Sequence, residues 1–377
     1  MQDLRHFFAP LHFLDTQTPG SYSKEQYGAF VSYGNETGFD WEEADIIIVG
    51  CGEQRGFKED ATYSNSPDAI RHQFYKMNNW QPAIKIADAG NIIEGATLGD
   101  TRAALRTVLT ELHQAGKIVI VLGGSHDLAL QQYEAFKKTE TIINVATADM
   151  LIDLEEEELV TSRSFLMDML TGEPNFVRHY SHIGFQSYYV KPQLIETLDK
   201  LRFDFFRVGK VKEHMENMEP ILRNSDLFSF DLSAICYSHT PANIEGSPNG
   251  FNGEEACSLM RYAGMSGRLT SLGIYGYDPT KDVRQMTAKQ AAQMLWYFID
   301  GYVVRTIEAD FKDENEFIRY HIRFVEYETQ FMKSKRTNRW WMELPDKSWI
   351  PCSYADYIQA CNNEISERWL REQERLV

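Results

Sequence analysis

The sequence predicts a three-layer α/β/α fold around an eight-stranded, mostly parallel β-sheet. Short runs rich in β-branched residues, which are typical of buried parallel strands, alternate along the chain with segments of helical periodicity. Turn residues or helix-capping residues separate these segments, as they do in α/β proteins. Several of the expected strands also end in polar residues, and the carboxyl edge of an open α/β sheet is where ligands bind.

The expected strands are apolar cores bounded by polar residues or glycine. They cover residues 45–50, 85–90, 118–123, 141–149, 178–186, 205–211, 227–233 and 269–277. Helices are expected between them, where a capping residue precedes apolar positions at helical spacing. Ser66 and Pro67 begin the first helix, and Gly116 ends the second. The helices cover residues 66–75, 100–115, 127–138, 193–201, 213–223, 254–265 and 287–308.

The alternation of strands and helices stops near residue 310 of the 377-residue chain. We therefore expect one large domain over residues 1–310 and a C-terminal extension over residues 311–377. The extension is expected to pack on this domain or on a neighbouring subunit, and to close in an amphipathic helix over residues 355–374. The first forty residues are expected to pack over an edge of the large domain.

Composition excludes several classes of protein. The formal net charge is −17, which disfavours nucleic acid and anionic membranes as partners, although basic residues and tryptophans mix in residues 333–341. No segment approaches the roughly 18 apolar residues of a membrane span, and the N-terminus lacks the layout of a signal peptide. The five cysteines are scattered and form no C-x-x-C pair. These features predict a cytoplasmic protein with a small-molecule substrate.

One histidine and three aspartates at strand ends predict a metal site. The strand at 118–123 runs into a glycine pair, which allows a sharp turn that delivers His126 to the carboxyl edge of the sheet. Two later strands run into acids, which are Asp149, Asp153 and Asp231. An imidazole with three carboxylates suits Mn²⁺, Mg²⁺ or Fe²⁺ better than a structural zinc ion.

At these residues the chain resembles the ureohydrolase family, which contains arginase, agmatinase, guanidinobutyrase and formimidoylglutamase. The resemblance covers about residues 44–309 and rests on Ser66–Arg71, Asp88–Ile92, Gly123–His126, the Asp149 segment, His182–Gln186, Ser229–Asp231 and Gly276–Pro279. Residues 161–166 and 182–186 look nearest to the formimidoylglutamase branch. The resemblance implies an arginase-like fold, and trimers or hexamers as the form of a homo-oligomer.

The resemblance also implies a ligand set. Members of the family hold two manganese ions between six side chains. Carried over position by position, His126, Asp149, Asp153 and Asp231 are the four ligands of one Mn²⁺ ion. Asp149 and Asp231 are the acids that bridge to the second ion in relatives.

Three positions depart from the family pattern. The second motif of the family reads Asp-x-His-x-Asp, but Leu151 occupies the histidine position, and the third reads Asp-x-Asp, but Ser233 occupies its last position. Because a strand projects alternate residues to one side, both positions face the crevice. The second metal site is therefore expected to be lost. Guanidine-hydrolysing relatives carry a glutamate where this chain has Gly276, so efficient cleavage of arginine or agmatine is not expected.

The leading hypothesis is a metal-dependent hydrolase of linear amidines, similar to formimidoylglutamase, with one Mn²⁺ ion. His126 and Asp153 are the predicted catalytic residues. Asp153 is expected to hydrogen-bond a water activated by the ion and to relay its proton. Arg163 is expected to meet a carboxylate of the substrate, and His239, in the loop after the third motif, to line the crevice.

Other interpretations stay open. The polar cluster is alternatively a metal-free, hydrogen-bonded remnant in a catalytically silent homologue that serves as a binding or oligomeric protein. The departures at Leu151, Ser233 and Gly276 favour this reading, and the four retained ligands oppose it. A single-metal amidohydrolase acting on another acyl–nitrogen bond is a third possibility. His179 and His182 point to opposite faces of one strand and are interpreted as core histidines.

Overall fold

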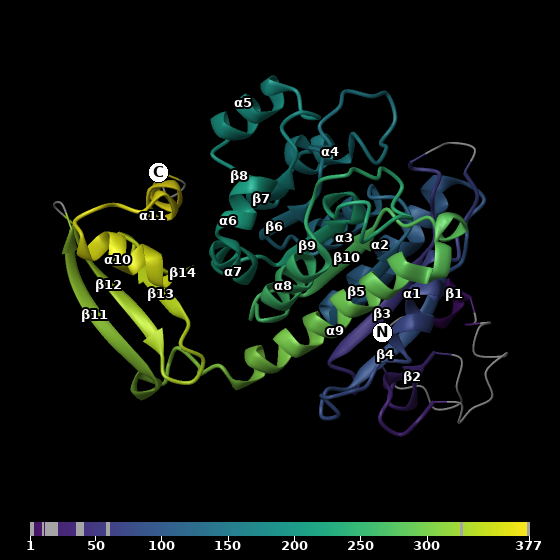
Figure 1. Ribbon diagram of the computed structural model, residues 1–377, viewed down its shortest axis with the longest axis horizontal. Coiled ribbons are helices and arrows are strands. Elements are labelled where there is room, and N and C mark those ends of the chain that lie inside the picture. Colours follow the sequence, from purple (N-terminus) through teal and green to yellow (C-terminus); the bar gives the residue numbers. More distant parts are fainter. Residues whose placement is uncertain are drawn as a thin grey trace.

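A large, mostly parallel sheet forms the centre of the computed structural model, which describes residues 4–9, 11, 22–34, 41–57, 61–324 and 327–374 (Figure 1). The order of strands along the sheet is β1-β4-β3-β5-β10-β9-β6-β7-β8, and β2 pairs with β4 beside this path. All eight predicted strands are present and pair in parallel. They are β3 (Ile46–Cys51), β4 (Ile86–Ile92), β5 (Ile118–Gly123), β6 (Ile143–Ala148), β7 (Val177–Phe185), β8 (Asp204–Arg207), β9 (Leu227–Asp231) and β10 (Ser271–Tyr275).

Two short strands that the sequence did not predict bring the sheet to ten. They are β1 (Phe8–Ala9), which pairs antiparallel to β4, and β2 (Ser32–Tyr33), which pairs parallel to β4. The described part of the first forty residues thus lies at the β4 end of the sheet. Each strand has only two residues, so neither carries enough apolar periodicity to be read from the sequence.

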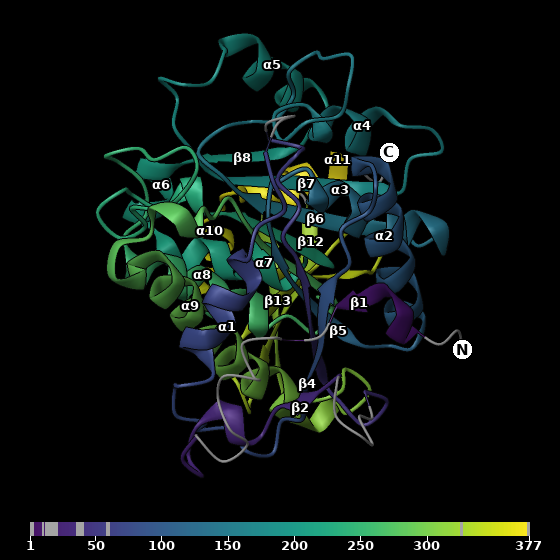
Figure 2. The ribbon, with the colours of Figure 1, turned by 90° about the vertical axis from the view of Figure 1, so that its right-hand side faces the viewer.

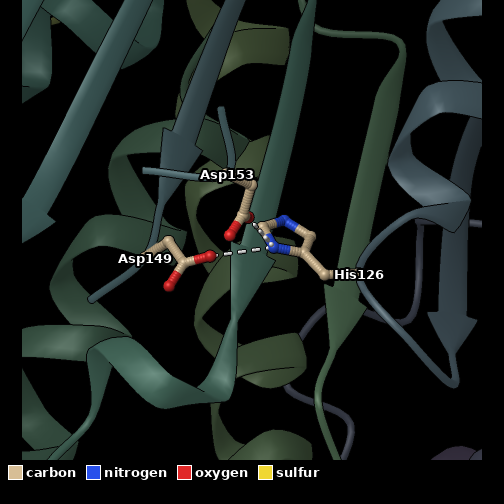
Figure 3. Close-up of side chains that lie close together, drawn as sticks. All are labelled: His126, Asp149 and Asp153. Atoms are coloured by element: carbon tan, nitrogen blue, oxygen red, sulfur yellow. Dashed lines mark ion pairs between the residues drawn. The ribbon is translucent and has the colours of Figure 1, made fainter. Parts of the chain in front are cut away.

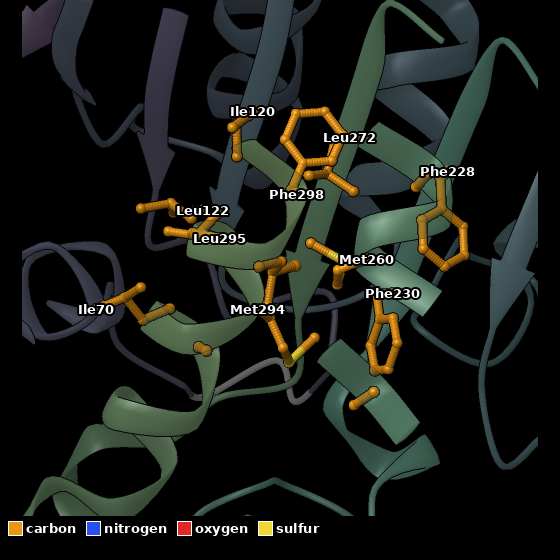
Figure 4. Close-up of a cluster of buried hydrophobic side chains, with 14 of the residues drawn as sticks. Ile70, Ile120, Leu122, Phe228, Phe230, Met260, Leu272, Met294, Leu295 and Phe298 are labelled. Atoms are coloured by element: carbon orange, nitrogen blue, oxygen red, sulfur yellow. The ribbon is translucent and has the colours of Figure 1, made fainter. Parts of the chain in front are cut away.

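Helices cover both faces of the sheet and bury two separate cores (Figure 2). In β3, Ile46 and Ile48 belong to one core, whereas Ile47 and Val49 belong to the other, as the alternation of a strand requires. The first core is covered by α1 (Ser66–Phe74), α6 (Val208–Glu213), α7 (Met218–Arg223), α8 (Gly253–Gly264) and α9 (Met286–Ile307) (Figure 4). The second is covered by α2 (Leu98–Gln114), α3 (Leu128–Lys138), α4 (Phe165–Thr171) and α5 (Pro192–Lys200). The predicted three-layer architecture is confirmed.

The structure corrects the boundaries around β8. Residues 208–211 were predicted to extend this strand, but they begin helix α6 instead. Val208 and Val211 lie three residues apart, so a helix turns both toward the first core, whereas an edge strand would turn them to opposite faces. The helix predicted over residues 213–223 is broken by a 3-10 turn, and its second part is α7.

Residues after 310 form a second, antiparallel sheet, in the order β11-β12-β13-β14. Its strands are β11 (Phe317–Phe324), β12 (Tyr327–Ser334), β13 (Trp340–Glu343) and β14 (Trp349–Cys352). The prediction of one closing helix over residues 355–374 is wrong, because the segment forms α10 (Tyr354–Cys361) and α11 (Glu367–Glu374). Asn363, at φ +64°, adopts a left-handed conformation that ends the first helix.

Part of the mixed tryptophan and basic segment of this second sheet packs inside the molecule, whereas Arg336 is exposed. Trp340 stacks on Tyr320 and lies against Tyr357 of α10, and Lys333 lies over the Trp340 ring. Arg339 is buried and donates a 2.6 Å hydrogen bond to the carbonyl of Met265 at the end of α8. In the part of the chain that the structure describes, no helix is long and apolar enough to cross a membrane.

Candidate metal centre

The strand order brings the predicted site together. Strands β5, β10, β9 and β6 are neighbours, and all four point the same way. His126 follows β5, Asp149 follows β6, and Asp231 ends β9, so all three reach the carboxyl edge of the sheet. The turn before His126 requires glycine at position 124, because a Cβ atom there would lie 2.0 Å from the carbonyl oxygen of Glu53.

Three carboxylates surround one nitrogen of His126. The distances from its Nδ1 atom are 2.9 Å to Asp149 Oδ2 and 3.2 Å to Asp153 Oδ2 (Figure 3), and 3.6 Å to Asp231 Oδ2. The candidate ligand atoms of His126, Asp149 and Asp153 all lie within 4.8 Å of one another, and Asp231 stands slightly farther out. All four residues are buried. The predicted ligands therefore converge on one point.

The orientation of the His126 ring fits metal coordination. Its Nε2 atom lies 2.5 Å from Ser229 Oγ on β9, which fixes the ring plane. Its Nδ1 atom is buried and, within the described part of the chain, has no partner with hydrogen-bond geometry, even though carboxylate oxygens lie close by. An imidazole lone pair aimed among carboxylate oxygens is the arrangement that one Mn²⁺, Mg²⁺ or Fe²⁺ ion needs. The residues present fit such an ion.

The charges of the cluster are strongly coupled. Burial opposes protonation of His126, but the close carboxylates of Asp149, Asp153 and Asp231 outweigh it and raise its pKa well above the usual range. Burial and the charge of Asp149 raise the pKa of Asp153 well above normal and that of Asp231 to about 6. Against its own burial, the close approach of the His126 imidazole lowers the pKa of Asp149 to about 2. A divalent cation would take the place of the protons that the cluster otherwise retains.

Leu151 and Ser233 both face Asp149. The Ser233 hydroxyl donates a 2.6 Å hydrogen bond to Asp149 Oδ1, and the Leu151 backbone N–H donates to the same oxygen at 2.9 Å. The Asp149 oxygen that points away from His126 is therefore already saturated by two donors. The Leu151 side chain lines the pocket and offers no lone pair.

An open pocket lies over the cluster, and its described lining includes all four predicted ligands. Arg163 lines this pocket, as the sequence predicted for a substrate-binding residue. His239 is exposed, and it is not among the described side chains that line the pocket. No bound molecule tests either role, so both remain predictions.

Sequence reasoning missed Glu245, which lines the same pocket and forms an ion pair with Arg163. Burial raises the pKa of Glu245, and Arg163 partly offsets this. Glu245 lies in a long loop at no fixed spacing from a strand, so periodicity could not place it. Its position is set by the backbone N–H of Ile244, which donates to the Gly276 carbonyl at 2.9 Å.

The two histidines of β7 behave as core residues. His179 lies 2.9 Å from Asp204 on one face of the strand. On the other face, His182 accepts from the Tyr180 hydroxyl at Nδ1 and donates from Nε2 to the Asp149 backbone carbonyl. Burial lowers the pKa of His182 to about 4, so the ring is neutral. His182 therefore supports the backbone of Asp149 and lies outside the group of ligands.

Comparisons of the sequence with known proteins point to one family. The model of the arginase family matches residues 44–300. The formimidoylglutamase of Legionella pneumophila (strain Lens) is 24% identical over 275 residues, which cover 67% of this chain and 84% of the relative. The formimidoylglutamase of Staphylococcus carnosus is 24% identical over 282 residues, covering 70% of this chain and 89% of the relative.

Solved structures share the fold. The formiminoglutamase of Trypanosoma cruzi, crystallised with two Mn²⁺ ions, superposes with a TM-score of 0.65 and 18% identity, covering 71% of this chain and 96% of that protein. The formimidoylglutamase of Bacillus subtilis gives a TM-score of 0.67 and 16% identity, covering 78% of this chain and 99% of that protein. At these identities the likeness establishes the arginase-type fold.

Proposed function

The chain belongs to the arginase family, and we propose that within this family it is a metal-dependent hydrolase of linear amidines, similar to formimidoylglutamase. One observation carries the proposal. The buried Nδ1 atom of His126 is aimed among the carboxylates of Asp149, Asp153 and Asp231, at the floor of an open pocket. The relatives that share most of the chain are formimidoylglutamases.

The proposed reaction adds water to a formimidoyl carbon. A C–O bond forms, the C–N bond to the amine breaks, and formamide and the free amine leave. A Mn²⁺ ion held by the cluster would lower the pKa of water and orient it. Asp153 would accept a hydrogen bond from that water and pass its proton to the departing nitrogen. His126 holds the centre in place through its contacts with Ser229 and the carboxylates.

We propose one ion rather than two. The second site would need ligands at positions 151 and 233, where the chain has an aliphatic side chain and a hydroxyl group that is already bonded to Asp149. A hydroxyl is a far weaker ligand for a hard cation than a carboxylate.

The proposal also covers the substrate contacts, the cellular compartment and the oligomeric state. The Arg163 guanidinium, at the pocket wall, would bind a substrate carboxylate, and His239 is a further candidate contact from the loop after β9. We propose that the protein acts in the cytoplasm, where its five free cysteines would stay reduced, and as a homo-oligomer.

A catalytically silent homologue is the second candidate. The observation that favours it is the loss of side-chain function at three neighbouring positions, which are Leu151, Ser233 and Gly276. Under this alternative the pocket would bind a ligand or none, and no bond would be cleaved.

Metal content decides between these candidates. We expect mass spectrometry of the untagged protein, after loading with Mn²⁺ and dialysis, to find about one ion per chain, as four ligands for one cation imply. Asp149→Ala should abolish binding, whereas Asp168→Ala, an exposed acid on α4, should retain it. The loaded protein should hydrolyse N-formimidoyl-L-glutamate but not arginine. Two ions per chain would contradict the single site, and no ion would leave the silent homologue standing.

A further inference from the structure

The ion pair between Arg163 and Glu245 lies at the wall of the pocket over the metal centre. We propose that Glu245 binds the amidinium group of the substrate, while Arg163, released from Glu245, binds a carboxylate of the same molecule. This inference rests on the proposed function and names the substrate class of that site, which is molecules carrying both an amidinium and a carboxylate.

Glu245 is the acid available for a substrate. The other acids that line the described pocket, Asp149, Asp153 and Asp231, are directed at His126. The Glu245 side chain is 20% exposed and is bound to Arg163, which is itself 43% exposed. Both partners line the pocket and are partly exposed, so an incoming ligand can reach each of them.

The backbone places Glu245 beside the carboxyl end of β10. The Ile244 N–H donates to the Gly276 carbonyl, and the Asp278 N–H donates to the Ala242 carbonyl, both at 2.9 Å. Gly276 itself has no room for a side chain, since a Cβ atom would lie 2.7 and 2.8 Å from the two carboxylate oxygens of Asp231, and its φ is +82°. The acid on this side of the pocket therefore comes from the adjacent loop.

The exchange of ion pairs makes the pocket selective for ligands that carry both an amidinium and a carboxylate. An amidinium that enters alone must separate Glu245 from Arg163, and it leaves the guanidinium with Glu155 as its one ion-pair partner among the described residues, at 3.9 Å. A substrate that also carries a carboxylate replaces one internal pair by two external pairs, so no charge is left without a partner. Simple alkyl amidines and guanidines are disfavoured by the same unpaired charge.

Calorimetric titration of the Mn²⁺-loaded protein tests the exchange, whether or not the ligand is turned over. The probes are N-formimidoyl-L-glutamate and N-butylformamidine, which has the amidinium but no carboxylate. Glu245→Gln should weaken binding of both probes about 10- to 100-fold, as loss of one partner of a close charge pair does. Glu155→Gln removes a charge that also faces Arg163 but does not line the pocket, so it should change binding less than about 3-fold.

Arg163→Gln should change the binding affinities for the two probes in opposite directions. The substitution should weaken binding of N-formimidoyl-L-glutamate about 10-fold or more. It should strengthen binding of N-butylformamidine, because Glu245 no longer has an internal partner. Melting temperatures and Mn²⁺ content of each variant show that the fold and the metal centre are intact.

The outcomes separate this inference from the proposed function. Hydrolysis with equal binding by wild type and Glu245→Gln would overturn the role of Glu245 and leave the hydrolase standing. Binding that depends on Glu245 and Arg163 without any hydrolysis would support the ion-pair exchange and overturn the hydrolase. Failure of the wild type to bind either probe at millimolar concentration would overturn both.

Discussion

Under our proposal, the hydroxyl group of Ser233 limits the metal centre to one ion. Its oxygen occupies the space beside Asp149 Oδ1, at 2.6 Å, and also accepts from the backbone N–H of Met150 at 3.3 Å. The hydrogen bond from Ser233 thus occupies the oxygen through which Asp149 would bridge to another cation. A small change of chemistry at this position should change the number of ions.

The double variant Leu151→His, Ser233→Asp should bind a second Mn²⁺ ion. It restores an imidazole and a carboxylate on the side of Asp149 away from His126, which are ligands that this ion accepts. Without Mn²⁺, the new carboxylate would face Asp149 in a buried site, so unfolding free energy should fall by roughly 1–3 kcal/mol.

Mass spectrometry of metal content and urea denaturation with and without Mn²⁺ measure both effects. The pair Leu151→Phe, Ser233→Asn serves as the control for altered volume without strong ligands. A restored variant that still binds a single ion would contradict our assignment of these two positions.

At the scale of elements, helices α2 and α3 pack against each other through the His113 ring. The His113 ring stacks on Phe136 with centroids 4.4 Å apart, and among the described residues neither ring nitrogen has a hydrogen-bond partner. Burial lowers the pKa of His113 from its usual 6.5 to about 4. The packing of these helices therefore depends on a neutral imidazole.

Acid should weaken this packing between pH 6.5 and 4. In that window the unfolded chain binds a proton at His113 that the native chain excludes, so stability falls as pH falls, by up to about 3 kcal/mol. His113→Phe keeps the stacking on Phe136 and removes the proton. Its urea midpoint should thus decline less steeply than that of the wild type from pH 7 to pH 4, whereas His214→Gln, at an exposed position, should follow the wild type.

Elements differ in how far their sequence determines them. Most of the eight parallel strands were predictable because they are compact apolar runs, buried on both faces, that a helix must follow. The change from strand to helix at Val208 was not, because β8 pairs on one side only and tertiary packing decides its length. The second sheet was also missed, since its aromatic residues pack against its own helices rather than following a clear alternation.

The candidate site divides in the same way. His126 and the three acids follow strands directly, so the parallel order of the sheet fixes where they meet. Glu245 lies in a loop whose position depends on backbone pairing with residues 276–278, and no local pattern encodes that pairing. The polar residues that follow strands could be predicted from this sequence, whereas the acid in the loop could not.

At the scale of the whole molecule, buried arginines join the second sheet to the rest of the chain. Arg223 of α7 lies over the Trp341 ring at 4.4 Å and donates to the carbonyls of Trp340 and Cys352. Arg339 forms ion pairs with Glu308 at the end of α9. The division of the chain near residue 310 stays a prediction, but these contacts indicate that both parts unfold together.

The double variant Arg223→Gln, Arg339→Gln should uncouple the two parts. Four of the seven tryptophans lie beyond residue 310, so fluorescence reports mainly on the second sheet, whereas far-ultraviolet circular dichroism reports mainly on the helices of the large part. In the wild type the two thermal transitions should coincide.

In the double variant the fluorescence transition should move to lower temperature than the dichroism transition. Arg319→Gln, Arg336→Gln removes two exposed arginines of the second sheet and should leave the transitions together. Coincident transitions in the first variant would show that apolar contacts, and not these arginines, couple the parts.

The assembly of the metal centre from three separate strand ends ties the ion to the folded state. The unfolded chain holds His126, Asp149 and Asp231 far apart, so it has no comparable affinity for a cation. By linkage, a free Mn²⁺ concentration 100 times the dissociation constant adds about 2.7 kcal/mol to the stability of the native protein. The supply of manganese in the cell would then govern how much of this protein survives proteolysis, before it governs any turnover.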